Sequence, residues 1–267
     1  LTEARFLESA GQRAKKTIPV HLKIETGMNR IGVPVDGLRP FLRSIRSLRR
    51  LEIKGVYSHF ATSEERDKRF ARIQLRRFHE ALEILKREGV SPELLHMANS
   101  GAVLDVPESY FSMVRPGMMM YGYYPSHDTT ESVTLKTAMM LRSRVSLVKW
   151  IERSESVGYG RKFTARKRTK IATVPVGYAD GFSRLLSGKA SVLIHGKKFP
   201  VAGSIAMDQI MINVGKADVG VGDEVVLMGS QGTQSITAWD IADILGTVPY
   251  EVCSSVAERV PRVYKKS

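Results

Sequence analysis

Two tyrosines stand beside glycines within residues 157–182, Tyr159 in the motif VGYG and Tyr178 in the motif VGYADG. Glycine permits tight turns, so each phenol can be held out from a loop near a predicted strand over residues 170–176. A phenol held in this way can donate or accept a proton. Tyrosines in turns can instead have a purely structural role, in which they pack and form hydrogen bonds. The local pattern leaves the catalytic and the structural interpretation open.

Polar side chains gather where the predicted strands of the first half end, which is where α/β folds collect functional groups. Ser100 opens a short predicted helix and Gly117 follows Arg115, so a hydroxyl and backbone N–H groups can hold a phosphate there. Each residue alone is explained equally well by a structural hydrogen bond, but together they predict a site for an anionic small molecule. The residues are Lys23, Arg30, His59, His96, Asn99, Ser100 and Arg115.

Other common catalytic patterns are missing from the sequence. The six histidines are scattered, and there is no H-x-x-x-H, C-x-x-C or calcium-loop motif, so we expect no metal site. Neither a serine nucleophile elbow nor a P-loop occurs. The single cysteine, Cys253, has no local cationic partner and is expected to be a packing residue.

The elements that must position these residues alternate between strands and helices over residues 1–133. Such alternation predicts a parallel sheet. The four strands found are about half the number in an eight-stranded β/α barrel, which usually takes about 250 residues. The sheet is therefore either a small open one or the latter half of a barrel. Strands are predicted over residues 19–25, 51–57, 94–97 and 111–114, and helices over 1–16, 35–50 and from Ser63 to Gly89.

Helical periodicity disappears after Val133, and short β-rich runs separated by turn signals take over. One late helix is predicted over residues 237–245, ending at Gly246. The fold class is therefore α/β followed by mainly β, with domains at residues 1–133 and 134–267. The β-rich runs are 140–150, 170–176, 190–194, 198–201, 209–214 and 224–228.

Composition narrows the class of protein. A formal charge of +14 permits polyanion binding, but the Lys and Arg residues are spread along amphipathic segments without stacking aromatics, which argues against a nucleic-acid partner. A non-catalytic basic fragment with incidental polyanion affinity stays an alternative. No apolar run of about 18 residues predicts a membrane span, residues 1–16 do not read as a signal peptide, and a lone cysteine fits a reducing cytoplasm.

Eight sequence blocks, in the same order and at similar spacings over nearly the whole chain, resemble alanine racemases. The resemblance implies a homodimeric enzyme that depends on pyridoxal 5'-phosphate, with an N-terminal β/α barrel and a C-terminal β domain. The blocks are LKIETGMNRIG (22–32), SHFATSE (58–64), HMANSGA (96–102), VRPGMMMYG (114–122), VGYGRKFTA (157–165), VPVGYADGF (174–182), AGSIAMDQIMI (202–212) and VPYEV with RVPRVY (248–264).

The resemblance also implies catalytic roles. Tyr159 is similar to the tyrosine base that reaches into the partner subunit's site. Arg115 is similar to the arginine that faces the pyridine nitrogen and keeps it unprotonated, since a guanidinium does not give up its proton. His59 resembles the histidine that links these two. A tyrosine of ordinary pKa, near ~10, is a poor base at neutral pH, so Tyr159 needs this hydrogen-bonded support.

Binding roles follow from the same blocks. Arg30 and Met207 resemble the pair that meets the substrate carboxylate, and Tyr178 resembles a residue at the substrate entrance. Lys23 matches a lysine that is often carbamylated in the family and steadies the arginine seven residues on. The positions that match phosphate-binding residues are Ser100, Gly117, Met118 and Tyr250.

The implied reaction is two-base proton transfer at Cα of an alanine–pyridoxal phosphate aldimine, which would supply D-alanine for peptidoglycan in a bacterial cytoplasm. Serine, lysine or broad-specificity racemases of the same fold are alternatives. The family's Schiff-base lysine motif, resembling A-V-x-K-A-x-A-Y-G-H-G, does not occur in these 267 residues. The sequence therefore reads as the C-terminal two-thirds of such an enzyme, and the chain by itself is expected to be inactive.

Overall fold

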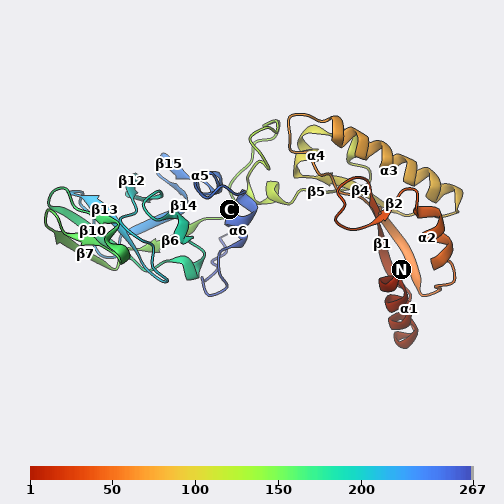
Figure 1. The fold of residues 1–267 in the computed structure, drawn as a ribbon, viewed down its shortest axis with the longest axis horizontal. Coiled ribbons are helices and arrows are strands. Elements are labelled where there is room, and N and C mark those ends of the chain that lie inside the picture. Colours follow the sequence, from red (N-terminus) through yellow and green to blue (C-terminus); the bar gives the residue numbers. More distant parts are fainter. Residues whose placement is uncertain (266–267) are drawn as a thin grey trace. The chain divides into compact units, whose positions relative to one another are not determined.

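A computed structural model describes residues 1–265, and these fall into two compact units, 1–135 and a second that begins at Lys136 (Figure 1). The first unit is an α/β fold and the second is mainly β, as the sequence predicted. Within the described residues no helix is both long and apolar enough to cross a membrane.

The first unit contains one parallel sheet of five strands in the order β2-β1-β3-β4-β5. Helices α2 to α4 connect successive strands, which gives the predicted β/α alternation. In the described residues this sheet is open, and its being the latter half of a closed barrel stays a prediction. The elements are α1 (Thr2–Ala14), β1 (Ile18–Glu25), β2 (Val33–Pro34), α2 (Leu38–Ile45), β3 (Leu51–Tyr57), α3 (Arg69–Arg87), β4 (Leu94–Asn99), α4 (Ser100–Asp105) and β5 (Met113–Arg115).

Alternation along the strands divides the sheet into an apolar and a polar face. Leu22, Ile24 and Val56 are buried in a core with Leu38 of α2 and Phe78 of α3. Their sequence neighbours on the strands therefore point to the opposite face, where the polar residues of β1, β3 and β4 lie.

The largest differences from the predicted bounds in this unit concern α2 and the start of α3. The helix predicted over 35–50 is only α2, because Gly37 lies at its N-terminus and residues 46–50 turn into β3. Helix α3 begins at Arg69, since Lys68 Nζ donates to the carbonyls of Ser63 and Glu65 and holds the preceding loop out of the helix. Ser100 opens α4 as predicted, and Asn99 is the N-cap of that helix.

The second unit is built from antiparallel strands in two main sheets, one of order β13-β10-β7 and one of order β12-β11-β14-β15 with β6 paired to β14. The strands are β6 (Leu141–Arg144), β7 (Leu147–Ile151), β8 (Ser156–Val157), β9 (Phe163–Thr164), β10 (Thr169–Val174), β11 (Ser191–Ile194), β12 (Lys197–Pro200), β13 (Ile210–Gly215), β14 (Glu224–Gln231) and β15 (Gln234–Ile236).

Turn chemistry explains much of this unit. His195 and Gly196 both have positive φ (51° and 68°) and form the two-residue hairpin between β11 and β12 that the sequence signalled. Thr237 caps α5 (Ala238–Leu245) in a capping box with Asp240, and Gly246 ends the helix at φ 69°. A second late helix, α6 (Pro249–Ser254), was not predicted because six residues are too few to carry a periodicity.

Candidate active site

Arg115 is the centre of a polar cluster on the first sheet. Its Nη2 donates to the carbonyl oxygen of Ser58 at 2.8 Å and to that of Met97 at 3.2 Å. Nη2 also lies 3.2 Å from His59 Nδ1, and Nη1 lies 2.5 Å from His96 Nδ1. Because a guanidinium only donates hydrogen bonds, both imidazole Nδ1 atoms must accept. These four acceptors, two just after β3 and two in the middle of β4, fix the guanidinium at the end of β5.

Burial keeps both histidines of the cluster neutral. It is the main cause that lowers the pKa of His59 to about 4, and the positive charges of Arg115, Arg30 and Lys23 lower it further. Burial followed by the charge of Arg115 and by His21 lowers the pKa of His96 to about 4. A neutral imidazole carries one N–H, so each ring that accepts at Nδ1 carries its proton on Nε2.

Tyr57 and Lys23 complete the polar face. The Tyr57 ring stacks on the His96 ring with centroids 5.0 Å apart and planes 8° apart. Lys23 Nζ and Arg115 Cζ each lie 5.5 Å from the centroid of Tyr57, a distance at which a cation interacts favourably with the ring face. Strand register brings these residues together, since Lys23 pairs with Tyr57 and Tyr57 pairs with His96.

Lys23 is 9% exposed, and its Nζ donates to the carbonyl of Ile24 at 3.0 Å and to Ser58 Oγ at 3.4 Å. Burial lowers the pKa of Lys23 to about 8, with Arg115 and Arg30 adding to the effect and Glu25 opposing it. Among residues 1–265, Lys23, Arg30 and Arg115 have no carboxylate at ion-pair distance. Three cations without a carboxylate partner make this region suited to an anion.

A buried set of hydroxyls and one amide holds the loop that carries His59. Thr26 Oγ1 and Ser58 Oγ lie 2.7 Å apart, and Ser58 Oγ donates to the carbonyl of Ile24 at 2.9 Å. From α3, Gln74 Nε2 donates to the carbonyl of His59 at 3.1 Å and to Thr26 Oγ1 at 3.3 Å. The ends of β1 and β3 are thereby tied to each other and to the helix.

The predicted phosphate-binding positions of this unit lie close together. Asn99 Oδ1 accepts from the Ala102 N–H at 3.1 Å, and Ser100 Oγ accepts from the Met119 N–H at 3.3 Å. This links the start of α4 to the turn after β5. Gly117 is exposed with open space where a Cβ would stand, while Met118 is buried at 1% exposure and anchors the turn. A hydroxyl and a glycine turn thus adjoin the cation cluster through Arg115.

The predicted residues of the second unit lie on its loops. Tyr178 N–H donates to the carbonyl of Ala206 at 3.1 Å and Ala179 N–H donates to that of Met207 at 2.9 Å, so the Tyr178 and Met207 segments run side by side. Gly177 has extended backbone; it is required because a Cβ would stand 2.3 Å from the Ala206 oxygen. Glycine here allows two backbone segments of the same chain to approach closely, where the sequence suggested a turn.

Tyr159 follows Gly158 (φ 72°) and precedes Gly160 (φ 68°), so here the glycines do form the turn that the sequence predicted. Ser204 Oγ donates to the Tyr159 carbonyl at 2.9 Å, while the Tyr159 side chain is 73% exposed. The side chain of Tyr250, on α6, is also exposed. Both phenols are thus held outward by ordered backbone.

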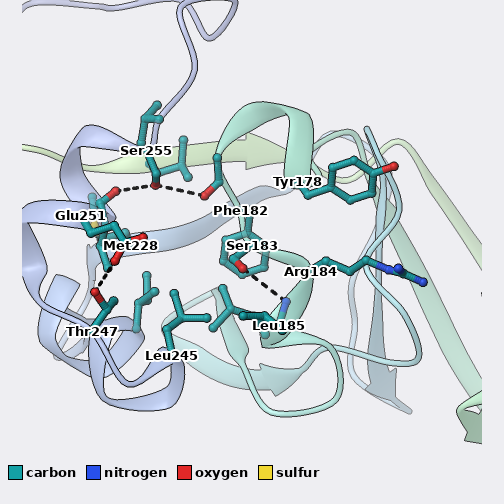
Figure 2. Close-up of a pocket in the computed structure, with 16 residues that line it drawn as sticks. Tyr178, Phe182, Ser183, Arg184, Leu185, Met228, Leu245, Thr247, Glu251 and Ser255 are labelled. Carbon is teal, nitrogen blue, oxygen red and sulfur yellow. Dashed lines mark hydrogen bonds between the residues drawn. The ribbon is translucent and has the colours of Figure 1, made fainter.

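Tyr178 also borders an apolar pocket of about 370 Å³ that is lined by residues around it and by α5 and α6. Figure 2 shows Tyr178 and Arg184 at one side of this pocket, with Thr247, Glu251 and Ser255 at the other. Asp180 holds the Tyr178 turn, since its carboxylate accepts from Gly177 N–H at 2.8 Å and from Arg259 Nε at 2.7 Å.

Sequence reasoning missed two residues of the cluster, His21 and Tyr57. His21 Nδ1 lies 2.7 Å from His96 Nε2, and Tyr57 stacks on the same ring. Two signals were available in the sequence. His21 lies two residues before Lys23, so both side chains lie on the same face of β1, and Tyr57 directly precedes the polar pair Ser58–His59. The search for polar residues near strand ends passed over His21, which lies in the middle of β1, and over Tyr57, which is the last residue of β3.

Comparison with known proteins gives a family. Residues 1–125 match the model "Alanine racemase, N-terminal domain" and residues 138–264 match "Alanine racemase, C-terminal domain". The chain belongs to the alanine racemase family. It is 44% identical to the alanine racemase of Clostridium novyi (strain NT) over 271 residues, which cover 100% of this chain and 70% of that protein.

Solved alanine racemases agree with this family and its fold. The enzyme of Streptomyces coelicolor A3(2) matches with a TM-score of 0.94 at 35% identity, covering 100% of this chain and 71% of that one. The enzyme of Bacillus anthracis "with bound L-Ala-P" matches with a TM-score of 0.92 at 35% identity, covering 98% and 69%. The protein is accordingly an enzyme of the isomerase class, a racemase.

Proposed function

We propose that this protein interconverts L-alanine and D-alanine with pyridoxal 5'-phosphate as cofactor. The observation that carries the proposal is the Arg115 cluster, a cation held by four acceptors beside Ser100 and Gly117. The alanine racemase relatives support the substrate, and the Bacillus anthracis relative is described with bound L-Ala-P.

The residues of the first unit fit this cofactor. The cofactor and an amino acid substrate both carry anionic groups, and Lys23, Arg30 and Arg115 have no carboxylate at ion-pair distance within the described chain. The open space beside Gly117 and the Ser100 hydroxyl suit a phosphate group, and the other proposed contacts are Met118 of the same unit and Tyr250 of the second unit. When bound, the cofactor supplies an electron sink for the charge that develops at Cα of the amino acid.

Arg115 is proposed to face the pyridine nitrogen. Because its guanidinium keeps its proton, Arg115 would leave the nitrogen of a bound pyridine ring unprotonated, which would weaken the electron sink and favour simple racemisation over side reactions. The four acceptors leave the guanidinium little freedom to reorient, so Arg115 would present its N–H groups to a bound cofactor in one orientation.

Tyr159 is proposed as the base that moves a proton at Cα, acting in the site of a partner subunit in a homodimer. Its exposed phenol is free to reach outside its own unit. His59 accepts from Arg115 at Nδ1 and so carries its proton on Nε2. That N–H can donate to a phenolate, which lowers the cost of ionising the tyrosine near neutral pH.

The remaining assignments concern the substrate. Arg30 and Met207 are proposed to meet its carboxylate, and Tyr178 to border its entrance. Carbamylation of Lys23 would place a negative charge beside Arg30, and a pKa of about 8 supports it because only a neutral amine reacts with CO₂. Supply of D-alanine to peptidoglycan in the cytoplasm is the proposed use.

The test is the rate of L- to D-alanine conversion with added pyridoxal phosphate, first for these 267 residues and, where they are inactive by themselves, for protein that also contains the family's cofactor lysine, each compared with Tyr159→Phe. Loss of a general base costs roughly 10²- to 10⁴-fold, so the variant should fall by at least 100-fold. Tyr264→Phe, which alters another highly exposed phenol of the same unit, is the matched control and should keep full activity. Full activity in Tyr159→Phe would refute the assignment.

No lysine of the sequence lies in a motif similar to the family's cofactor lysine. That the 267 residues are inactive by themselves therefore stays a prediction, which the same assay tests. A panel of alanine, serine and lysine as substrates distinguishes the alanine enzyme from the serine, lysine and broad-specificity alternatives.

A further inference from the structure

His21 contacts the Arg115 cluster from the far side. It lies on β1, two strands away from His96 on β4, with β3 between them. Its Nδ1 lies 2.7 Å from His96 Nε2, with ring centroids 5.0 Å apart and planes tilted by 54°. Its imidazole must therefore cross the middle strand to make this contact.

The sheet is shaped to let the ring cross. The pairing of β1 with β3 shifts register between Val20 and His21, so that His21 stands opposite Gly55. A Cβ on Gly55 would stand 2.5 Å from the Cε1 and Nδ1 atoms of His21. The backbone of Gly55 does not have positive φ, so its lack of a side chain matters only because the imidazole lies over it. The register shift in β1 and the glycine in β3 therefore both make room for the His21 imidazole.

The directions of the hydrogen bonds follow from Arg115. The guanidinium cannot accept, so His96 Nδ1 accepts its N–H and is unprotonated. Since His96 is buried and neutral, its proton is on Nε2 and is donated to His21 Nδ1. His21 Nδ1 is then unprotonated too, and the chain of donors runs from Arg115 through His96 to His21.

We propose that His21 is a positioning residue for Arg115: by accepting from His96 Nε2–H, it holds the His96 ring so that Nδ1 stays directed at the guanidinium. Tyr57 stacks on the face of the same ring, so the ring is held by one stacking contact and two hydrogen bonds. Without His21, the Nε2–H loses its protein acceptor and the ring can rotate. The consequence for turnover rests on the proposed function; the hydrogen-bond pattern does not.

The experiment is NMR of the protein with ¹⁵N-labelled histidine, in which two-bond ¹H–¹⁵N correlations identify the protonated nitrogen of each ring. His96 is expected to carry its proton on Nε2, with Nδ1 unprotonated, and His21 is expected to have an unprotonated Nδ1. His21→Asn should preserve the His96 signals, because its amide oxygen can replace Nδ1 as acceptor. His21→Leu should shift both His96 nitrogen signals.

Activity provides the second measurement. His21→Leu should lower kcat roughly three- to tenfold, the size expected for one hydrogen bond, with His21→Asn recovering most of the loss and KM changing little. His79→Leu, which alters an exposed histidine on α3, is the control and should change neither. Circular dichroism of each variant verifies folding.

Two results of the NMR experiment would overturn the inference: a proton on Nδ1 of His96, or unchanged His96 signals in a folded His21→Leu protein. Because the spectra need neither cofactor nor substrate, the expected pattern together with a lack of racemisation in protein that contains the cofactor lysine would refute only the proposed function. Racemase activity that His21→Leu leaves unchanged would refute the positioning role.

Discussion

At the scale of single residues, one side chain determines the state of its neighbours. Arg115 can only donate, so His59 and His96 must both accept at Nδ1, and their burial near its charge keeps them neutral. The same surroundings lower the pKa of Lys23 to about 8. The acid–base character of the site is therefore an effect of burial and of a fixed cation, and not of the residue types alone.

The two neutral histidines predict how stability depends on pH. The pKa of each is about 4 in the folded protein against an ordinary value of 6.5, so the unfolded chain binds more protons between these values. Stability is thus fully present above about pH 6.5 and is lost as pH falls towards 4, with each group contributing at most ~1.4 kcal/mol per pH unit. Urea unfolding of the protein and of His96→Asn at pH 4.5 to 7 measures this, and the variant should depend less steeply on pH. An equal slope would contradict the prediction.

Lys23 should react with CO₂ where ordinary lysines do not. Because its pKa of about 8 leaves part of the amine neutral near neutral pH, ¹³C-bicarbonate should give a carbamate ¹³C signal that Lys23→Arg abolishes. Lys54, whose pKa is raised by hydrogen bonds to Glu93 and Glu52, is the matched control, so Lys54→Arg should keep the signal. A signal that persists in Lys23→Arg would place the modification elsewhere.

At the scale of elements, the polar face depends on strand irregularities as much as on strand pattern. The register shift in β1 and the bare Gly55 in β3 make room for the imidazole of His21. A second register shift between β4 and β5 sets Asn99 opposite Arg115, which aligns the cap of α4 with the arginine. Bulges of this kind re-aim side chains beside functional sites.

The close approach of His21 to Gly55 predicts that substitutions at these two positions change the free energy of unfolding non-additively. Gly55→Ala should destabilise the protein by roughly 1–3 kcal/mol, because its Cβ would overlap the imidazole. In a His21→Ala background the same change should be neutral or slightly stabilising, since alanine suits a strand better than glycine. Denaturant unfolding of the four proteins gives the coupling energy. Gly220→Ala, with open space around its Cβ, is the control; additive effects at His21 and Gly55 would contradict the predicted overlap.

At the scale of the whole molecule, the proposed catalytic residues are divided between two compact units. The arginine and histidines belong to residues 1–135, and the exposed Tyr159 belongs to the second unit. The net charge of +14 is also a property of the whole molecule. Within the described site, only the three cations Lys23, Arg30 and Arg115 contribute to it. The proposed function therefore requires residues from both units, supplied by one chain or by two.

Mixing two inactive variants tests which arrangement holds. If Tyr159 acts in the partner's site, Tyr159→Phe mixed with Arg115→Ala should form dimers in which one site has both residues. With random pairing half of the dimers are mixed and each has one intact site of two, so about a quarter of the activity should return. If both residues of a site come from one chain, no activity should return. The two variants measured separately are the controls.

The order of elements could be predicted because it depends on local periodicity. β3 was predicted over its observed residues, β1 within one residue, and the capped helix α5 was found from Thr237 and Gly246. The starts of α2 and α3 could not be predicted in this way. Gly37 determines where α2 begins, and the contacts of Lys68 with Ser63 and Glu65 determine where α3 begins. Of the cluster, Lys23, His59, His96 and Arg115 were singled out at predicted strand ends.

The sequence by itself determined the family, the change from α/β to β character and the polar residues at strand ends, since these follow from motifs and periodicity. Only the tertiary structure decided that His21 and Tyr57 belong to the site, that Asn99 caps α4, and that His59 and His96 are neutral. The physical reason is that register, burial and hydrogen-bond direction depend on neighbours from other strands. A sequence lists donors and acceptors, but the fold decides which of them meet.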